Sequence, residues 1–387
     1  AIGQNAHKGA LYLSQNDSYN LKWETGEAYG VALEARLFNR WNLSVEYFDK
    51  RNKDLLFDIY LPLSAGGTST GAAEATVTRN LGTISNRGIE VNTDIDVFRN
   101  KDWTFNIAAN ATYLKNKIVK LPDQNKEGII AGAYKIVEGK SRYEFYTYTF
   151  EGVDQLTGNS LYKANLDDYY VTLKDGTTLG NTKSGVDITK KATVINGVPY
   201  VTNTTYGQRE FHGSALPTVY GSFTGTIGYK SLTLSALFTY SLGGKIMDGV
   251  YQSLMTTGTS PSNYHADIMN SWKQAPEGME ENAPNRILKD GIPQINSMLS
   301  SDNNAVSSRW LTSADYLVVK NLTLAYRLPQ TWVEHIGLQS VGLNFTCENL
   351  WTFAARQGMN PQQSFAGAQE NYLVTPRIFS FGVSVKL

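Results

Sequence analysis

The sequence predicts an all-β membrane protein: part of a transmembrane antiparallel β-barrel, with about nine strands and long extracellular loops. Three observations predict this fold class. Many segments alternate between apolar and polar residues, as in WTFNIAANATY at residues 103–113, and this period of two is typical of a β-strand with one apolar face. Short and long connections alternate between these segments. Aromatic side chains gather near the strand ends, as they do at membrane interfaces.

Nine segments of the chain carry the strand pattern. They are residues 28–37, 42–50, 88–98, 103–113, 218–229, 232–242, 314–328, 341–349 and 377–387. The alternation is less regular in the fifth and seventh of these segments. In the seventh, Lys320 shares a face with Leu322 and Leu324, so we expect a β-bulge or an interfacial position at Lys320.

The connections indicate which fold the strands build. Short links are expected at residues 39–41, 99–102, 230–231 and 329–340. Long links are expected at residues 61–80, 118–217, 245–312 and 354–375. Short turns on one rim and long loops on the other are typical of outer-membrane barrels. A soluble sandwich has no reason to place every long loop at one end.

The strand ends and the polar strand faces favour the same interpretation. Aromatic residues near strand ends, where a barrel carries its girdle, are Trp103, Tyr113, Tyr229 and Tyr240. The polar faces would line a wide aqueous lumen. The charged residues expected on this lumen lining are Glu34, Arg36, Glu46, Glu90, Asp94 and Asp96. In the alternative fold, a soluble sandwich, the apolar faces and the aromatic side chains would instead fill a core.

The composition argues against several other classes of protein. Lysine plus arginine and aspartate plus glutamate both number 35, so the formal net charge is zero, whereas a nucleic-acid-binding protein usually carries a basic excess. The single cysteine, Cys347, cannot form an internal disulfide. No run of 18 apolar residues predicts a transmembrane helix. Residues 1–15 lack the features of a signal peptide, so we expect that one was removed or that the chain starts within a larger protein.

No pattern typical of an enzyme, a metal site or a cofactor site is found. The four histidines lie without metal-ligand spacing, at His7, His212, His265 and His335. Residues 123–128 resemble the start of a calcium loop, but Tyr134 stands where a bidentate glutamate is required. No catalytic carboxylate pair stands out from the expected lumen lining. We therefore expect no catalytic residue, no metal, no cofactor and no nucleic-acid partner.

The best candidate for substrate binding is YEFYTYTF, at residues 143–150 within the longest loop. Aromatic faces stack on sugar rings or on peptide side chains, and tyrosine adds a hydroxyl that forms hydrogen bonds. The expected contacts are Tyr143, Phe145, Tyr146, Tyr148 and Phe150. The alternative is that this segment builds a structural strand. By position, residues 271–278 and 355–367 are further candidates for contact with a substrate or a partner.

Six phrases occur together in an order that is typical of one family. They are NLKWE (20–24), SNRGIEV (85–91), NKI (116–118), GKSRYEFYTYTFEGVDQLTGN (139–159), DYLVVKNLTLAYRLP (315–329) and ENLWTF (348–353). Together they resemble the C-terminal barrel portion of the SusC/RagA-type TonB-dependent transporters of the Bacteroidota outer membrane. The resemblance extends from about residue 20 to residue 387. Leu387 departs from it, because such barrels usually end in an aromatic residue.

The resemblance implies a fold that is larger than this chain. It implies a 22-stranded barrel around an N-terminal plug. Residues 1–387 would be its C-terminal portion, and the plug domain and first strands would lie outside this chain. The C-terminus would be periplasmic, and residues 1–25 would lie in an extracellular loop. Because about nine strands alone would leave two open edges in lipid, the remaining N-terminal part of the same transporter is an expected partner.

The function implied by the resemblance is import across the cell outer membrane. Further implied partners are outer-membrane lipid, a SusD-like lipoprotein lid, and the TonB–ExbB–ExbD complex acting through the plug and its TonB box. The implied substrates are glycan or peptide fragments. The alternative is a secreted, soluble β-rich module that binds glycans or acts as an adhesin. A passive porin or secretion barrel is a second alternative, and a glycan hydrolase is a third, against which the lack of a carboxylate pair argues.

Overall fold

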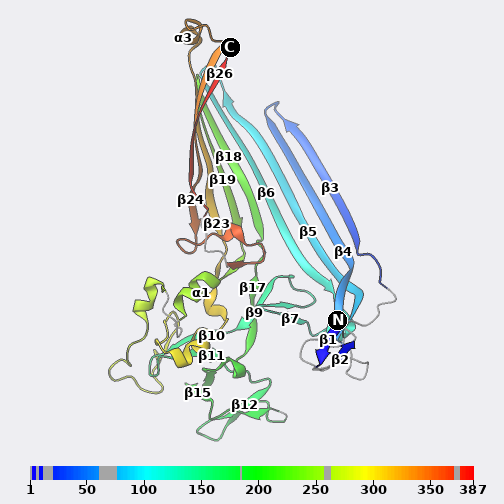
Figure 1. Cartoon of the computed structure of the whole chain (residues 1–387), viewed down its shortest axis with the longest axis vertical. Coiled ribbons are helices and arrows are strands. Elements are labelled where there is room, and N and C mark those ends of the chain that lie inside the picture. The colour runs from blue at the N-terminus through cyan, green and yellow to red at the C-terminus, as the bar shows by residue number, and fades with distance from the viewer. Residues whose placement is uncertain are drawn as a thin grey trace.

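The computed structural model describes residues 2–5, 8–11, 21–60, 76–183, 185–256, 263–369 and 375–387. Its largest element is one antiparallel sheet of nine long strands that run side by side (Figure 1). The strands are β3 (Thr25–Leu37), β4 (Trp41–Tyr60), β5 (Thr76–Arg99), β6 (Trp103–Lys120), β18 (Val219–Tyr229), β19 (Leu232–Leu242), β23 (Tyr316–Arg327), β24 (Ser340–Ala354) and β26 (Ile378–Lys386). Their order in the sheet is their order in the sequence, from β3 at one edge to β26 at the other. The nine expected strands are therefore confirmed.

Short turns connect the strands at one end of the sheet. They join β3 to β4, β5 to β6, β18 to β19 and β23 to β24, the last through helix α3 (Gln330–Glu334). In the first turn Phe38 and Asn39 have φ of 52° and 53°, which fits the tight hairpin turns that match the twist of the strands. The C-terminus and α3 lie together at this end, and the long connections leave the opposite end (Figure 1). The alternation of short and long connections is therefore confirmed.

Several strands are longer than their alternation indicates. β4 and β5 have 20 and 24 residues, about twice the 9–11 residues that a tilted strand needs to cross a bilayer. Their far ends remain paired up to Tyr60 opposite Thr76. The expected connection over 61–80 is therefore wrong for residues 76–80, because these two strands keep pairing beyond the length that spans the membrane.

The irregularity in the seventh strand is a β-bulge, as expected. The pairing of β19 with β23 shifts so that Leu237 lies opposite Asn321 and Phe238 lies opposite Val319. The pairing of β23 with β24 shifts at the same point, so Lys320 is skipped on both sides. Its Nζ donates a hydrogen bond of 2.8 Å to Oδ1 of Asn349. The extra residue therefore lets the strand keep its apolar face on either side of Lys320.

Beyond the far end of the sheet, the long connections fold into what we call the loop layer, the described parts of residues 121–218, 243–315 and 355–377 (Figure 1). Its small sheets are β17–β9–β8–β7, β15–β16–β11–β10–β21, β13–β12–β14 and β22–β20–β25. The bounds of these strands are β7 (Ile129–Ala131), β8 (Tyr134–Ile136), β9 (Glu144–Tyr148), β10 (Phe150–Asp154), β11 (Ser160–Lys163), β12 (Tyr169–Thr172), β13 (Thr178–Gly180), β14 (Val186–Asp187), β15 (Ala192–Ile195), β16 (Val198–Val201), β17 (Arg209–Ser214), β20 (Lys245–Asp248), β21 (Ile287–Leu288), β22 (Leu311–Ser313) and β25 (Ala368–Gln369).

Short helices complete the loop layer. They are α1 (Gly249–Met255), α2 (Ser300–Asn303), η2 (Asp123–Asn125), η3 (Thr204–Tyr206), η4 (Ala266–Asn270), η5 (Ser297–Leu299), η6 (Ser308–Trp310) and η7 (Pro361–Gln363). In the described part of the chain, no helix is long and apolar enough to cross a bilayer. A separate hairpin near the N-terminus pairs β1 (Ile2–Asn5) with β2 (Lys8–Leu11).

The hydrophobic clusters lie almost entirely outside the nine-stranded sheet. The two largest are in the loop layer, around Phe145 and Trp310 and around Tyr162 and Val201. The sheet itself is a single layer, and the apolar side chains of its last strand are exposed. Phe381, for example, is 69% exposed. A sheet needs a second layer to bury its apolar face in water. Among the described residues no second layer covers this face, an arrangement that fits the lipid-facing side of a barrel wall.

Candidate functional site

The polar side chains of the sheet form rows across several strands. One row pairs Glu34 with Ser44, Ser44 with Asn92, Asn92 with Asn110 and Asn110 with Ser222, so it crosses five strands. Within it, Nδ2 of Asn110 donates a hydrogen bond of 2.7 Å to Oγ of Ser222. A hollow of about 550 Å³ lies along this row. The polar face is therefore concave here, as the inner wall of a barrel must be.

The six charged residues expected on the lumen lining share this polar face. Glu34, Arg36 and Asp94 line the hollow, and Glu46 lies directly opposite Glu90 one step along the same face. A further member of the set, Asp96, accepts a hydrogen bond of 3.1 Å from Nδ2 of Asn106, which also lies 3.4 Å from Asp94. Their contact with water or with a substrate stays a prediction.

The aromatic segment 143–150 is a structural strand in part. Residues 144–148 form β9, in which Phe145 and Thr147 are buried and the other three residues are half-buried. Phe145 has no exposed surface, and its ring packs in the cluster of Trp310. The expectation that Phe145 contacts a substrate is therefore wrong for this conformation, because alternate residues of β9 face the interior of the loop layer.

The other four aromatic residues of this segment are half-buried against neighbours. Tyr143 packs against the cluster of Phe145. Arg209 lies 4.6 Å over the ring of Tyr148 and donates to its hydroxyl. The remaining two rings have partners as well, Tyr146 on Phe211 and Phe150 on Tyr162. Substrate contact by these four residues stays a prediction. Such a contact would use the exposed part of each ring.

A cleft of about 630 Å³ opens in the loop layer between α1, residues 265–267 and residues 356–359. The guanidinium of Arg356 lies 3.7 Å over the ring of Tyr251. The Tyr251 hydroxyl donates a hydrogen bond of 2.8 Å to Asp267, and its amide donates to Asp248, the N-cap of α1. Nδ1 of His265 accepts the amide hydrogen of Asp267. The cleft thus offers both hydrogen-bond donors and acceptors to a polar ligand.

The lining of the cleft includes a tyrosine, an arginine, a histidine and two aspartates. Burial of the phenol and its hydrogen bond to Asp267 raise the pKa of Tyr251 above its ordinary value, so this hydroxyl stays protonated. Nε of Arg356 lies 3.9 Å from Oδ2 of Asp248, a distance longer than a hydrogen bond. Among the residues that the structure describes, no group of histidine, cysteine, aspartate or glutamate has the geometry of a metal site.

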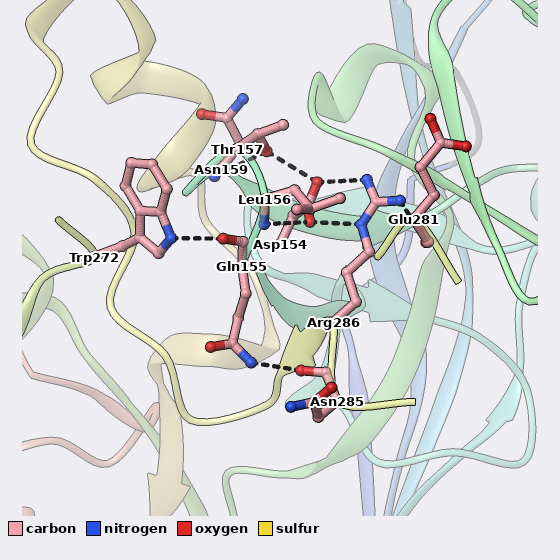
Figure 2. A network of polar contacts seen from close by, with 9 residues as sticks. All are labelled: Asp154, Gln155, Leu156, Thr157, Asn159, Trp272, Glu281, Asn285 and Arg286. Atoms are coloured by element: carbon pink, nitrogen blue, oxygen red, sulfur yellow. Dashed lines mark hydrogen bonds and ion pairs between the residues drawn. The ribbon is translucent and has the colours of Figure 1, made fainter. Parts of the chain in front are cut away.

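A buried ion pair fastens two parts of the loop layer to each other (Figure 2). Nε and Nη2 of Arg286 donate hydrogen bonds of 2.8 and 2.9 Å to the carboxylate of Asp154, which also accepts from the Leu156 amide and the Thr157 hydroxyl. Trp272 lies in the same network and donates through Nε1 to the carbonyl of Gln155. The hairpin of β10 and β11 is therefore fixed to the connection that follows α1.

The pKa values of this pair reflect the same contacts. Burial raises the pKa of Asp154, but hydrogen bonds from Arg286, the Leu156 amide and the Thr157 hydroxyl outweigh it and hold the pKa below its ordinary value. The hydrogen bond to Asp154 raises the pKa of Arg286. Both groups are therefore charged at neutral pH.

Sequence reasoning missed most of these residues. Tyr251, Asp267 and Arg286 are separated from their partners by 16 to 132 residues, and nothing in the local pattern joins them. Three signals did exist. Arg356 lies in the candidate segment 355–367, and Asp154 lies in the longest of the six phrases. The candidate segment 271–278 contributes Trp272 to the ion-pair network.

Comparison with known proteins finds similarity to TonB-dependent receptors. The family described as TonB dependent receptor-like, beta-barrel matches residues 7–132. TonB-dependent receptor P3 of Formosa agariphila is 27% identical over 89% of this chain and 31% of its own length. TonB-dependent receptor SusC of Bacteroides thetaiotaomicron is 21% identical over 95% of this chain and 32% of its own length. The chain thus spans about a third of the length of these relatives.

Solved structures give the same fold. The structure of the RagAB peptide transporter superposes with a TM-score of 0.70 at 20% identity, covering 100% of this chain and 38% of the matched one. The RagAB peptide importer in its open-open state superposes with a TM-score of 0.69, also at 20% identity, covering 100% of this chain and 37% of the matched one. The resemblance found in the sequence is therefore confirmed.

Proposed function

We propose, from the premise that this chain is a barrel portion of a SusC/RagA-type TonB-dependent transporter, that it forms wall and extracellular loops of an outer-membrane importer for glycan or peptide fragments. One observation carries the proposal. A single sheet has a concave polar face, an apolar face without a protein layer over it, and all its long connections at one end. This combination fits a wide barrel with an aqueous interior and a capture surface above its mouth.

The proposal assigns a direction to each end of the sheet. The short turns and the C-terminus face the periplasm, and the loop layer faces the outside of the cell. A SusD-like lipoprotein closes over the loop layer. The rest of the transporter supplies the remaining strands, the plug and the TonB box, on which the TonB–ExbB–ExbD complex acts. Barrels of this width hold a plugged lumen, so import requires that the plug move.

Within this scheme the loop layer captures the substrate before the plug opens. The cleft of Tyr251 and Arg356 is one binding surface for it, because donors and acceptors converge there on a hollow large enough for a small ligand. The exposed parts of Tyr143, Tyr146 and Tyr148 are another. One similar structure is described as a peptide transporter, which supports peptides as one of the two substrate classes. The charged lumen lining would then form the wet wall of the path.

The test uses the full-length protein from native outer membranes. A tag on the chromosomal gene allows extraction with and without detergent, followed by denaturing intact mass. We expect extraction only with detergent, a mass more than about twice the 42.8 kDa of this chain, and a lipoprotein that copurifies. Uptake of labelled oligosaccharides and peptides should be lost when TonB is deleted.

Other outcomes would favour the other candidate functions. A folded monomer of 42.8 kDa that is released without detergent would support a secreted binding or adhesin module and overturn the proposal. Uptake that persists without TonB, together with ion conductance in a planar bilayer, would support a passive porin or a secretion barrel.

A further inference from the structure

The short-turn end of the sheet carries a row of interfacial aromatic and aliphatic residues. Trp103 lies opposite Tyr229, Tyr229 opposite Leu232, and Leu232 opposite Tyr326, so the row crosses four strands at one level. The rings of Trp103 and Tyr229 contact each other with centroids 4.5 Å apart. Aromatic side chains of this kind sit at the headgroup level of a bilayer. The row therefore marks where the lipid headgroups begin at this end.

Basic side chains follow immediately beyond that row. Lys101, Lys230 and Arg327 are two, one and one residues past Trp103, Tyr229 and Tyr326 respectively. The basic residues of the four turns and the strand ends beside them, which we call the rim cations, are Arg40, Arg99, Lys101, Lys230, Arg327 and Lys386. All six are exposed. The same turns hold only two acidic residues, Asp102 and Glu334.

The rim cations have no counter-ion in the part of the chain that the structure describes. None of them takes part in an ion pair there, although eight pairs of a lysine or arginine with a carboxylate occur elsewhere among the described residues. The whole chain has no net charge, so this excess at one end is a local feature. Like charges held close together repel each other. An anionic surface placed against them would remove that cost.

Helix α3 adds an apolar contact at the same end. Val333 is buried and faces the protein, whereas Trp332 and Ile336 are 64% and 68% exposed. Trp332 lies within α3, and Ile336 lies in the turn that follows the last residue of the helix. Large apolar side chains beside basic ones are typical of segments that lie in the membrane interface.

We propose that the rim cations, together with Trp332 and Ile336, bind anionic phospholipid headgroups of the leaflet at the short-turn end of the barrel. The phosphate groups accept hydrogen bonds from Lys101, Lys230 and Arg327 at the level set by the aromatic row. This contact fixes the height of the barrel in the membrane. If the short turns face the periplasm, as in the proposed function, this leaflet is the periplasmic one. Only the identity of the leaflet rests on the proposed function.

The test measures lipid binding to the purified full-length transporter, so it needs neither TonB nor a substrate. Delipidated protein in a neutral detergent is titrated with phosphatidylglycerol or with phosphatidylcholine, and bound lipid is counted by native mass spectrometry. The rim variant carries Lys101→Gln, Lys230→Gln and Arg327→Gln. A matched control removes three exposed lysines of the loop layer instead, with Lys174→Gln, Lys183→Gln and Lys190→Gln.

We expect the rim variant to bind phosphatidylglycerol about a hundredfold more weakly, from about fivefold for each basic residue at an anionic lipid surface. Its binding of phosphatidylcholine should not change, and the control variant should behave as the wild type. Equal losses in both variants, or no loss in the rim variant, would overturn the proposal. Where the triple variant fails to assemble, Lys230→Gln alone should still show the fivefold loss. Failure of import with intact lipid binding would refute the proposed function only.

Discussion

Replacing Asp154 with asparagine is expected to loosen the loop layer locally. The side chains of Asp154 and Arg286 are 1% and 7% exposed, and two hydrogen bonds of 2.8 and 2.9 Å join them. The Asp154→Asn change leaves the guanidinium buried opposite a neutral amide. Removal of one partner from a buried ion pair costs about 3–5 kcal/mol. Because 1.4 kcal/mol is a factor of ten, the population of the open state of this turn should rise by about two to four orders of magnitude.

Hydrogen exchange in the full-length transporter measures this opening. The Gln155 amide donates to the carbonyl of Arg286, and the Gln294 amide donates to that of Gly158, so both report on the contact. The control is Lys174→Gln, which breaks the exposed pair of Lys174 with Glu281 and should change exchange less than about fivefold. Equal protection in the Asp154→Asn variant and this control would refute the reasoning.

The same contact predicts a pH dependence with a definite sign. The folded-state pKa of Asp154 lies below its ordinary value of 3.8, so the unfolded turn binds the proton more tightly. The stabilisation is therefore fully present above about pH 4 and is lost as the pH falls through the folded-state pKa. Protection of the Gln155 amide, corrected for intrinsic exchange, should be constant from pH 5 to 8 and fall in more acidic solution. The Asp154→Asn variant should show no such fall.

Three further predictions test the faces of the sheet and the core of the loop layer. Phe381→Arg should reduce the stability of the assembled barrel by about 2–4 kcal/mol because it places a charge on the lipid-facing side, whereas Ser380→Arg on the opposite face should be tolerated. Heat-modifiable gel mobility distinguishes the two variants, and equal effects would contradict the assignment of faces. Gly158→Ala should displace Trp272, because Gly158 has φ of +73° and an added Cβ would lie 2.3 Å from that ring; unchanged protease cleavage in residues 271–278 would count against this. Phe145→Ala should destabilise the loop layer by about 3–5 kcal/mol, seen as faster limited proteolysis, while a stable loop layer would show that Phe145 is not a core residue.

Most of the sheet could be predicted from the sequence because its information is local. A strand with lipid on one face and water on the other must alternate with a period of two, and seven of the nine segments do so without a marked irregularity. The bulge at Lys320 was visible because the period breaks there. The alternation does not predict the far ends of β4 and β5. Beyond the bilayer neither face must be apolar, so the alternation ends there although the two strands remain paired.

The loop layer could not be predicted in the same way, because its contacts join distant segments. Phe145 packs with Trp310, and Asp154 pairs with Arg286. The sequence of residues 143–150 is compatible with either a substrate-binding aromatic cluster or a structural strand. The alternation within the segment agrees with a structural strand, since Phe145 and Thr147 lie two residues apart and are both buried. Which of the two faces would be buried depended on the position of Trp310, and that is a property of the fold.

The contrast between the sheet and the loop layer follows from their solvents. The sheet has its apolar face in lipid, so it needs no core of its own, and its backbone hydrogen bonds are completed by neighbouring strands. The loop layer projects into water and must bury its own apolar groups around Phe145 and Tyr162. Clusters of this size are small, so a single buried ion pair such as Asp154 with Arg286 has a large share in the local stability. Substitutions in the loop layer should therefore change its local stability long before they change the pairing of the nine long strands.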